Sequence, residues 1–123
     1  MMIFIPPLGT KLRLVEDWTF PLHMEWRNSE AWSMMVDPQD SGRYYDPTRK
    51  PEMVTLPKGM VLNVERIYIR MGAGDYDSVT FRVVDGPLKH LVPKKAKGTA
   101  TGKCRFWVKL ADINNSLACE IQE

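Results

Sequence analysis

His23 and Glu25 are the pair whose types and spacing could carry acid–base chemistry in this 123-residue chain. Residues two apart in a strand point to the same face, where an imidazole and a carboxylate could exchange a proton. The alternative is that His23 is an ordinary residue on a polar strand face, and the rest of the sequence favours it. No serine or cysteine stands in a G-x-S-x-G turn, and the adjacent carboxylates Glu16 and Asp17 would point to opposite strand faces. We therefore expect no enzyme activity and no catalytic residue.

A glycine-rich stretch, GAGDYDS, lies within residues 70–86 and invites comparison with phosphate-binding loops. Gly72 and Gly74 match the first two glycines of G-x-G-x-x-G, but Asp77 occupies the third position and a strand pattern follows instead of a helix. Without a helix N-terminus, no converging backbone amides would hold a phosphate. We interpret the stretch as a hairpin connection. A weak cation site at Asp75 and Asp77 is the alternative.

The metal-ligating residue types are few and scattered. Cys104 and Cys119 form no C-x-x-C motif, and His23 and His90 are the only histidines. A zinc site would have to gather these residues from distant parts of the chain, so we expect no metal and no cofactor. Two reduced cysteines in a cytoplasmic protein are the favoured interpretation. A disulfide between neighbouring strands is the alternative if the protein is exported.

The charges are unevenly distributed, although the net charge is only +2. Seven basic residues and no acidic residue lie between Gly86 and Lys109. Lysines with a stacking aromatic suit single-stranded nucleic acid or a nucleotide, and a solvated loop is the alternative. The low net charge argues against a dedicated nucleic-acid binder. The candidate residues for this basic face are Lys94, Lys95, Lys97, Lys103, Arg105 and Trp107.

A second candidate surface combines tyrosines with basic residues. Tyrosine and arginine are common anchors of protein interfaces, and they could equally stack and pair with a nucleotide. The alternative is that the tyrosines cover the edge of the core. The candidate residues are Arg43, Tyr44, Tyr45, Arg49 and Lys50, joined by Trp26 and Arg27.

Periodicity predicts a mainly β domain of five to six strands that spans residues 1–123, with one short helix and two long loops. Strands are expected at 10–15, 18–26, 60–71, 78–84, 104–110 and 117–121. Pro21 should lie at a sheet edge or a bulge, and a phase change near Glu65 predicts a bulge there. Asn28 should cap a short helix that turns Trp32 toward the core. The loops are expected at 37–58 and at 85–103, the latter basic and flexible, and a tight turn or a single 3₁₀ turn is expected at 111–115.

No apolar run approaches the roughly 20 residues that span a bilayer. The start, MMIFIPPLG, has no basic region before it and no small-residue cleavage site, so it does not look like a signal peptide. We expect no membrane partner.

Two segments resemble the SH3-like barrel. LPKGMVLNVERIYI is similar to the turn and second strand of that fold, and RFWVKLADINNSLACEI is similar to its ending of strand, 3₁₀ turn and short last strand. With TKLRLV as the first strand and SVTFRVV as the third, the resemblance covers about half of the chain and makes 16–58 an enlarged first loop. The ALYDY and paired-tryptophan signatures of peptide-binding SH3 domains are missing. The resemblance therefore implies a fold and not proline-rich peptide binding.

The chain also resembles short accessory proteins of tailed bacteriophages, in the segments PPLGTKLRLVEDWTF, RIYIRMGAGDYDSVTFRV and FWVKLADIN. That resemblance implies the cytoplasm of a bacterial host. The expected function is non-enzymatic: a phage-encoded factor that binds and inhibits or redirects a host protein. The alternative is nucleic-acid or nucleotide binding through the basic 94–109 face. A small domain with open strand edges can also form a homodimer.

Overall fold

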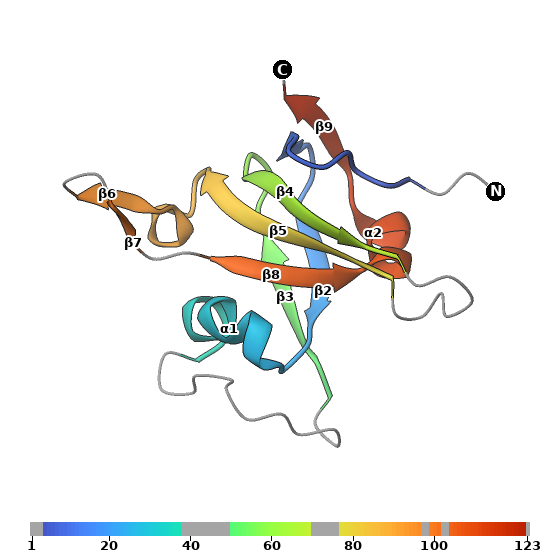
Figure 1. Ribbon diagram of the computed structural model, residues 1–123, viewed down its shortest axis with the longest axis horizontal. Helices are drawn as coiled ribbons and strands as arrows, with labels where there is room; N and C mark the ends of the chain where they lie inside the picture. Colours follow the sequence, from blue (N-terminus) through green and yellow to red (C-terminus); the bar gives the residue numbers. More distant parts are fainter. Residues whose placement is uncertain (1–3, 38–49, 70–76, 97–98, 102–103, 123) are drawn as a thin grey trace.

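The structure is a computed structural model that describes residues 4–37, 50–69, 77–96, 99–101 and 104–122 (Figure 1). The strands are β1 (Lys11–Leu14), β2 (Trp18–Leu22), β3 (Glu52–Leu56), β4 (Val61–Tyr68), β5 (Ser78–Asp85), β6 (Lys94–Ala96), β7 (Thr99–Thr101), β8 (Arg105–Lys109) and β9 (Cys119–Gln122). The helices are α1 (Ser29–Met35) and α2 (Leu110–Ser116), with 3₁₀ turns η1 (Trp26–Asn28) and η3 (Lys89–Leu91). No helix in these ranges is long and apolar enough to cross a membrane.

Five strands form one antiparallel sheet in the order β8-β5-β4-β1-β9, and β2 and β3 pair behind it (Figure 1). The short strands β6 and β7 form a separate hairpin that projects from one end. The predicted mainly β class is confirmed. Because β8 and β9 are the two edges of the five-stranded sheet, that sheet does not close into a barrel within the described chain.

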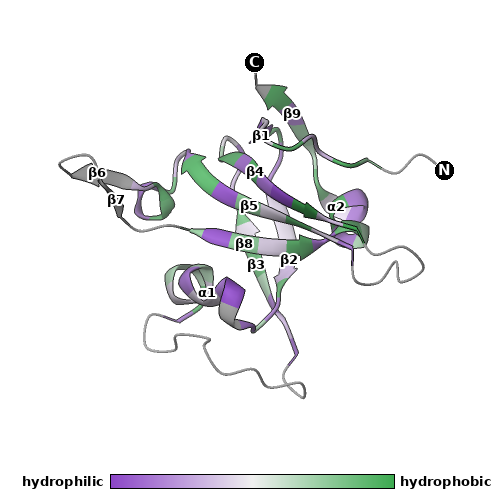
Figure 2. Cartoon of the chain, in the orientation of Figure 1, coloured by the Kyte–Doolittle hydropathy of each residue, from purple (hydrophilic) through white to green (hydrophobic). Residues whose placement is uncertain are grey.

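Alternation along the strands explains the stacking of the two sheets. In β5, Val79, Phe81 and Val83 are buried while the residues between them face outward, and Figure 2 shows hydrophilic and hydrophobic stretches alternating along β4, β5 and β8. The predicted irregularity near Glu65 is confirmed as a shift in the β4–β5 register between Val64 and Arg66.

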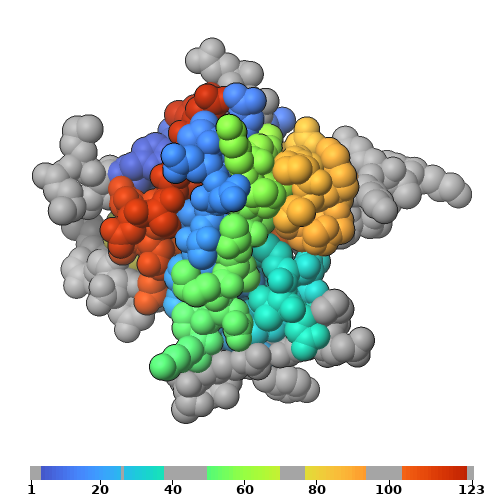
Figure 3. Space-filling model, turned by 180° about the vertical axis from the view of Figure 1, so that it is seen from behind, coloured from blue at the N-terminus to red at the C-terminus, as the bar shows by residue number. Residues whose placement is uncertain are grey.

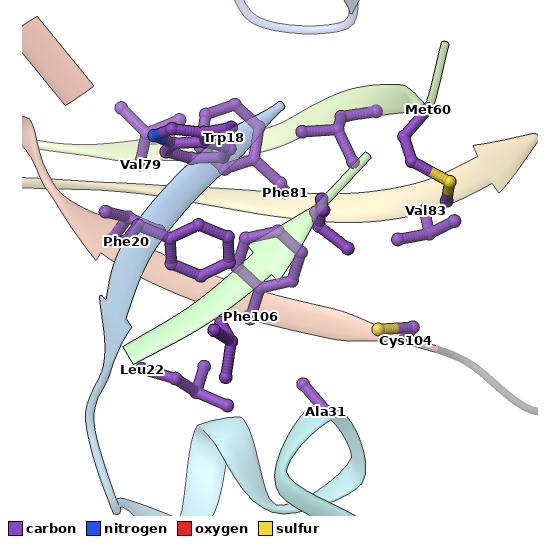
Figure 4. Packing of buried hydrophobic residues seen from close by; sticks show 14 of the residues in the cluster. Trp18, Phe20, Leu22, Ala31, Met60, Val79, Phe81, Val83, Cys104 and Phe106 are labelled. Carbon is purple, nitrogen blue, oxygen red and sulfur yellow. The ribbon is translucent and has the colours of Figure 1, made fainter. Parts of the chain in front are cut away.

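Aromatic rings fill the space between the sheets (Figure 4). Phe20 of β2 stacks on Phe106 of β8, with centroids 5.0 Å apart. Trp18 contacts Phe81 edge-on at 5.7 Å. All four side chains are completely buried and are among the largest in the core. Trp32 of α1 is also completely buried, as predicted.

The predicted long loops proved partly wrong. β3 lies inside the predicted 37–58 loop and pairs with β2 along its whole length. Its flanking prolines, Pro51 and Pro57, interrupt no ladder because they stand just outside the strand. Segment 16–58 is therefore more than an enlarged loop, since it carries the entire second sheet. The predicted 85–103 loop likewise contains η3 and the β6–β7 hairpin.

Two smaller predictions also differ from the structure, and one is confirmed. The strand predicted at 18–26 ends at Leu22, and η1 begins at Trp26. The predicted 3₁₀ turn at 111–115 is helix α2, in which Leu110 and Ile113 are buried three residues apart. Pro21 lies in β2, which pairs only with β3 in the described chain, so the predicted edge position is confirmed.

Candidate functional site: an arginine–tryptophan pocket

A pocket of about 410 Å³ opens where the outer face of the five-stranded sheet meets η1 and the first turn of α1. This volume lies within the range of small-molecule sites. We call it the arginine–tryptophan pocket. Its lining residues are Arg27, Ser29, Glu30, Glu65, Arg66, Thr80, Arg105 and Trp107.

Strand register aligns the floor of the pocket. Thr80 of β5 pairs with Arg66 of β4 on one side and with Trp107 of β8 on the other. Directly paired residues of neighbouring strands point to the same face, so these three side chains lie in one row across the sheet. The next row brings Arg82 opposite Arg105.

The bulge at Glu65 fixes that second row. The two oxygens of the Glu65 carboxylate form ion pairs with Arg82 Nε at 3.0 Å and with Arg105 Nε at 3.3 Å. Its side chain is only 22% exposed, which limits the screening of these pairs by water. Arg66, the next residue, has no ion-pair or hydrogen-bond partner among the described residues, so its guanidinium is available to a ligand.

Trp107 is held from three directions. The ring of His23 stacks on it at 4.8 Å with planes 10° apart. Its indole Nε1 donates to Glu25 Oε2 at 2.5 Å, and Arg27 Nε donates to the other Glu25 oxygen at 2.7 Å. The guanidinium carbon of Arg27 lies 5.8 Å from the indole centroid. The indole is therefore oriented before any ligand arrives.

Asn28 joins η1 to the sheet edge and is completely buried. Its Nδ2 donates to the carbonyl of His23 at 3.0 Å, and its Oδ1 accepts the backbone N–H of Trp107 at 2.9 Å. The prediction that Asn28 caps α1 is right in position, but its side chain makes no capping hydrogen bond. It instead satisfies a backbone donor on the outer side of the edge strand β8.

The acid–base pair considered for His23 and Glu25 is not assembled. Both Glu25 oxygens are taken by Trp107 and Arg27, and His23 Nε2 is buried with no hydrogen-bond partner in the described chain. Burial lowers the pKa of His23 from its ordinary 6.5, and the nearby charge of Lys109 lowers it further. A neutral imidazole is thereby favoured, which suits a stacking role beside the indole.

The structure brings together parts of both predicted surfaces. Arg27 belonged to the predicted protein-binding set and Arg105 and Trp107 to the basic face, yet all three line one pocket. The backbone of Lys94 and Lys95 forms β6 in the projecting hairpin (Figure 1), and Lys50 is exposed just before β3. Trp26 lies in η1. Arg43, Tyr44, Tyr45, Arg49, Lys97, Lys103, Gly72, Gly74 and Asp75 lie outside the described residues.

The two cysteines stand at opposite edges of the sheet. Cys104 immediately precedes β8 and Cys119 begins β9, with β5, β4 and β1 between those edges. Both are free, and a disulfide between them does not fit this strand order. Burial raises the pKa of Cys104 to about 12, followed by the effect of Glu30. Within the described ranges, no three His, Cys, Asp or Glu residues are grouped to hold a metal ion.

Comparison with known proteins adds no relative: no family model, no curated protein and no solved structure matches the chain.

Proposed function

We propose that the protein is a non-enzymatic binding protein and that the arginine–tryptophan pocket holds a nucleotide unit, free or within single-stranded nucleic acid. The observation that carries the proposal is the meeting of Arg27, Arg66 and Arg105 around Trp107 in one pocket of about 410 Å³. Guanidinium forks match phosphate oxygens, and an oriented indole offers a surface for a base.

The division of labour follows from the contacts. Arg66 is the first phosphate ligand, since its guanidinium has no partner in the described chain. Arg105 shares Glu65 with Arg82, so it can turn toward a phosphate while Glu65 keeps one cation. Trp107 supplies the stacking surface: His23 already stacks on its ring and the Arg27 guanidinium lies over it at 5.8 Å, so a base would stack as Arg27 turns toward the phosphate.

The test is a titration of wild type with labelled oligo-deoxythymidine and, separately, with a panel of nucleoside monophosphates. Binding of the oligonucleotide should weaken steeply between about 50 and about 200 mM salt. Arg66→Ala and Trp107→Phe should each weaken binding. Arg13→Ala should not, because Arg13 is an exposed arginine of β1 that pairs with Glu120 of β9. Equal affinity of all four proteins, or no binding of either probe, would refute the assignment.

A double variant tests whether the basic face extends beyond the pocket. Lys94→Ala with Lys95→Ala removes charge from the β6–β7 hairpin and leaves the pocket intact. A loss confined to the oligonucleotide would indicate a nucleic-acid strand that runs from the pocket to the hairpin. An unchanged oligonucleotide affinity would limit the site to a nucleotide.

The second candidate is a protein partner, in line with the resemblance to phage proteins: a factor in the bacterial cytoplasm that binds and inhibits or redirects a host protein. The pocket favours it because arginine and tryptophan are frequent interface anchors. A partner's acidic side chain would then take the place of phosphate. Binding that survives nuclease, changes little with salt and is lost with Tyr44→Ala and Tyr45→Ala would support this candidate over the first.

We also propose that the fold is a variant of the SH3-like barrel. The strands that the resemblance ranks first to fifth are β1, β4, β5, β8 and β9, and they lie in one sheet. Each pairs with the next along the chain except β8 and β9, and β9 returns to β1 on its other side. Helix α2 precedes the last strand, at the place where the resemblance implies a 3₁₀ turn. An experimental structure with β8 and β9 paired would support a closed barrel.

A further inference from the structure

Strand β3 has an unpaired edge that borders a groove of about 250 Å³. On one side β3 pairs with β2, and the described chain places no strand on the other. Figure 3 shows β3 from behind, with α1 and the segment that follows β5 alongside it. The groove is lined by four consecutive β3 residues, 53–56, by Met34 and Met35 of α1, and by Leu88, His90 and Leu91 around η3.

The register reveals which backbone groups point into this groove. Pro21 stands opposite Met53 and has no N–H to give to the ladder. Two positions along, the hydroxyls of Thr19 and Thr55 approach to 2.8 Å, as side chains do in the close, non-hydrogen-bonded pairs of an antiparallel ladder. Met53 and Thr55 therefore direct their N–H and C=O groups away from β2, toward the open edge. No partner for these groups is found in the described chain.

Most of the side chains around the edge are of apolar types, and several are adaptable. Three of the lining residues are methionines, whose flexible thioethers adjust to different apolar side chains. Met53 is 62% exposed, although it is large and apolar. His90 is the one titratable lining residue of the described groove, so charge is depleted there, as at the centre of a protein interface.

We propose that this groove binds an extended segment of a partner protein, which adds to β3 as a further strand. The unpaired groups of Met53 and Thr55 would bond to the backbone of the segment, and the methionines would receive its alternate apolar side chains. The edge is recessed between α1 and η3, which favours a bare extended segment over the flat edge of a second folded copy. The groove shares no lining residue with the arginine–tryptophan pocket, so the proposal stands independently of nucleotide binding.

The experiment selects peptides on the wild-type protein from a displayed library of short random sequences, then measures a synthetic selected peptide by calorimetry. The diagnostic variant is Thr55→Pro, which removes one donor from the open edge and spares the bonds to β2. Its matched control is Thr19→Pro, which breaks the same hydroxyl pair but lies in β2, on the other side of the ladder. Met53→Lys is a second diagnostic variant at an exposed position, in case either proline disturbs folding.

We expect selected peptides to carry apolar residues at alternate positions. Thr55→Pro and Met53→Lys should each weaken binding by about tenfold or more, and Thr19→Pro should retain it. Bound peptide should also slow hydrogen exchange of the Met53 and Thr55 amides. Three results would each overturn the proposal: no enriched sequence, a selected peptide that binds Thr55→Pro as tightly as wild type, or a wild-type dimer that Thr55→Pro converts to monomer.

Discussion

Replacing Asn28 with alanine tests whether one buried amide fastens η1 to the edge of the sheet. The side chain is completely buried and makes two hydrogen bonds, to the His23 carbonyl at 3.0 Å and from the Trp107 amide at 2.9 Å. Alanine lacks the side-chain amide, so both hydrogen bonds are lost at once. The carbonyl and the amide then remain in a partly buried place with nothing to bond except entering water.

The magnitude follows from those two bonds. A typical hydrogen bond contributes about 1 kcal/mol net, and a buried group left unsatisfied costs about 1–3 kcal/mol. Because both orphaned groups of Asn28→Ala are only partly buried, we take the lower part of that range for each. The variant should lose about 2–4 kcal/mol of unfolding free energy, a large share of the roughly 5–15 kcal/mol of a typical domain.

Urea unfolding followed by tryptophan fluorescence measures this loss. The matched control is Asn115→Ala, the same substitution at an exposed position in α2, which should stay within about 0.5 kcal/mol of wild type. If Asn28→Ala also stays within that limit, the two hydrogen bonds do not stabilise the fold and the account of the edge is wrong. A changed urea slope would instead indicate a more expanded native or unfolded state.

Three further outcomes are expected. Burial lowers the pKa of His23 in the folded chain, so its contribution to stability is complete above the unfolded value of 6.5 and declines as pH falls through that value toward the folded pKa. His23→Gln should therefore reduce the loss of stability between about pH 7.5 and about pH 5.5. An unchanged loss would contradict the lowered pKa of His23. With its pKa raised to about 12, Cys104 should resist a thiol reagent in the native protein, while half-buried Cys119 reacts first; equal rates would count against the burial of Cys104. Gly86 has φ 137°, and an added Cβ would lie 2.8 Å from Met60 Cα. Gly86→Ala should therefore lower the free energy of unfolding by about 2–4 kcal/mol, measured by thermal or urea unfolding. A neutral result would show that this turn relaxes easily.

Much of the five-stranded sheet could be predicted from the sequence, because strict alternation is a local signal. Val79, Phe81 and Val83 identify both the strand β5 and its buried face. The bulge at Glu65 was equally visible as a change of phase. β3 was missed because Pro51 and Pro57 crowd its ends and the composition around it is that of a loop. Its pairing with β2 is a long-range contact, which no local pattern reports.

The site was predictable residue by residue but not as an assembly. Arginine and tryptophan were singled out by type, yet the sequence assigned Arg27 and Trp107 to different surfaces. What unites them is the pairing of η1 with the edge of β8 through Asn28, 79 positions from its partner Trp107. Arg66 was missed altogether, since a lone arginine in a strand carries no signal until its neighbours are known. Arg66 belongs to the pocket because strand register places it in one row with Thr80 and Trp107.

Both proposed surfaces depend on the segment between β1 and β4. Arg27 and Glu30 from that segment line the arginine–tryptophan pocket, and Met34, Met35 and residues 53–56 of β3 line the groove. The five-stranded sheet supplies a rigid floor for the pocket. Without the segment between β1 and β4, the outer row of β8 would be uncovered and the groove would lack its β3 edge. α1 divides the two sites, with its first turn at the pocket and its last turn at the groove. A ligand that shifts α1 at one site would therefore change the shape of the other, so the coupling to test is whether the selected peptide alters nucleotide affinity.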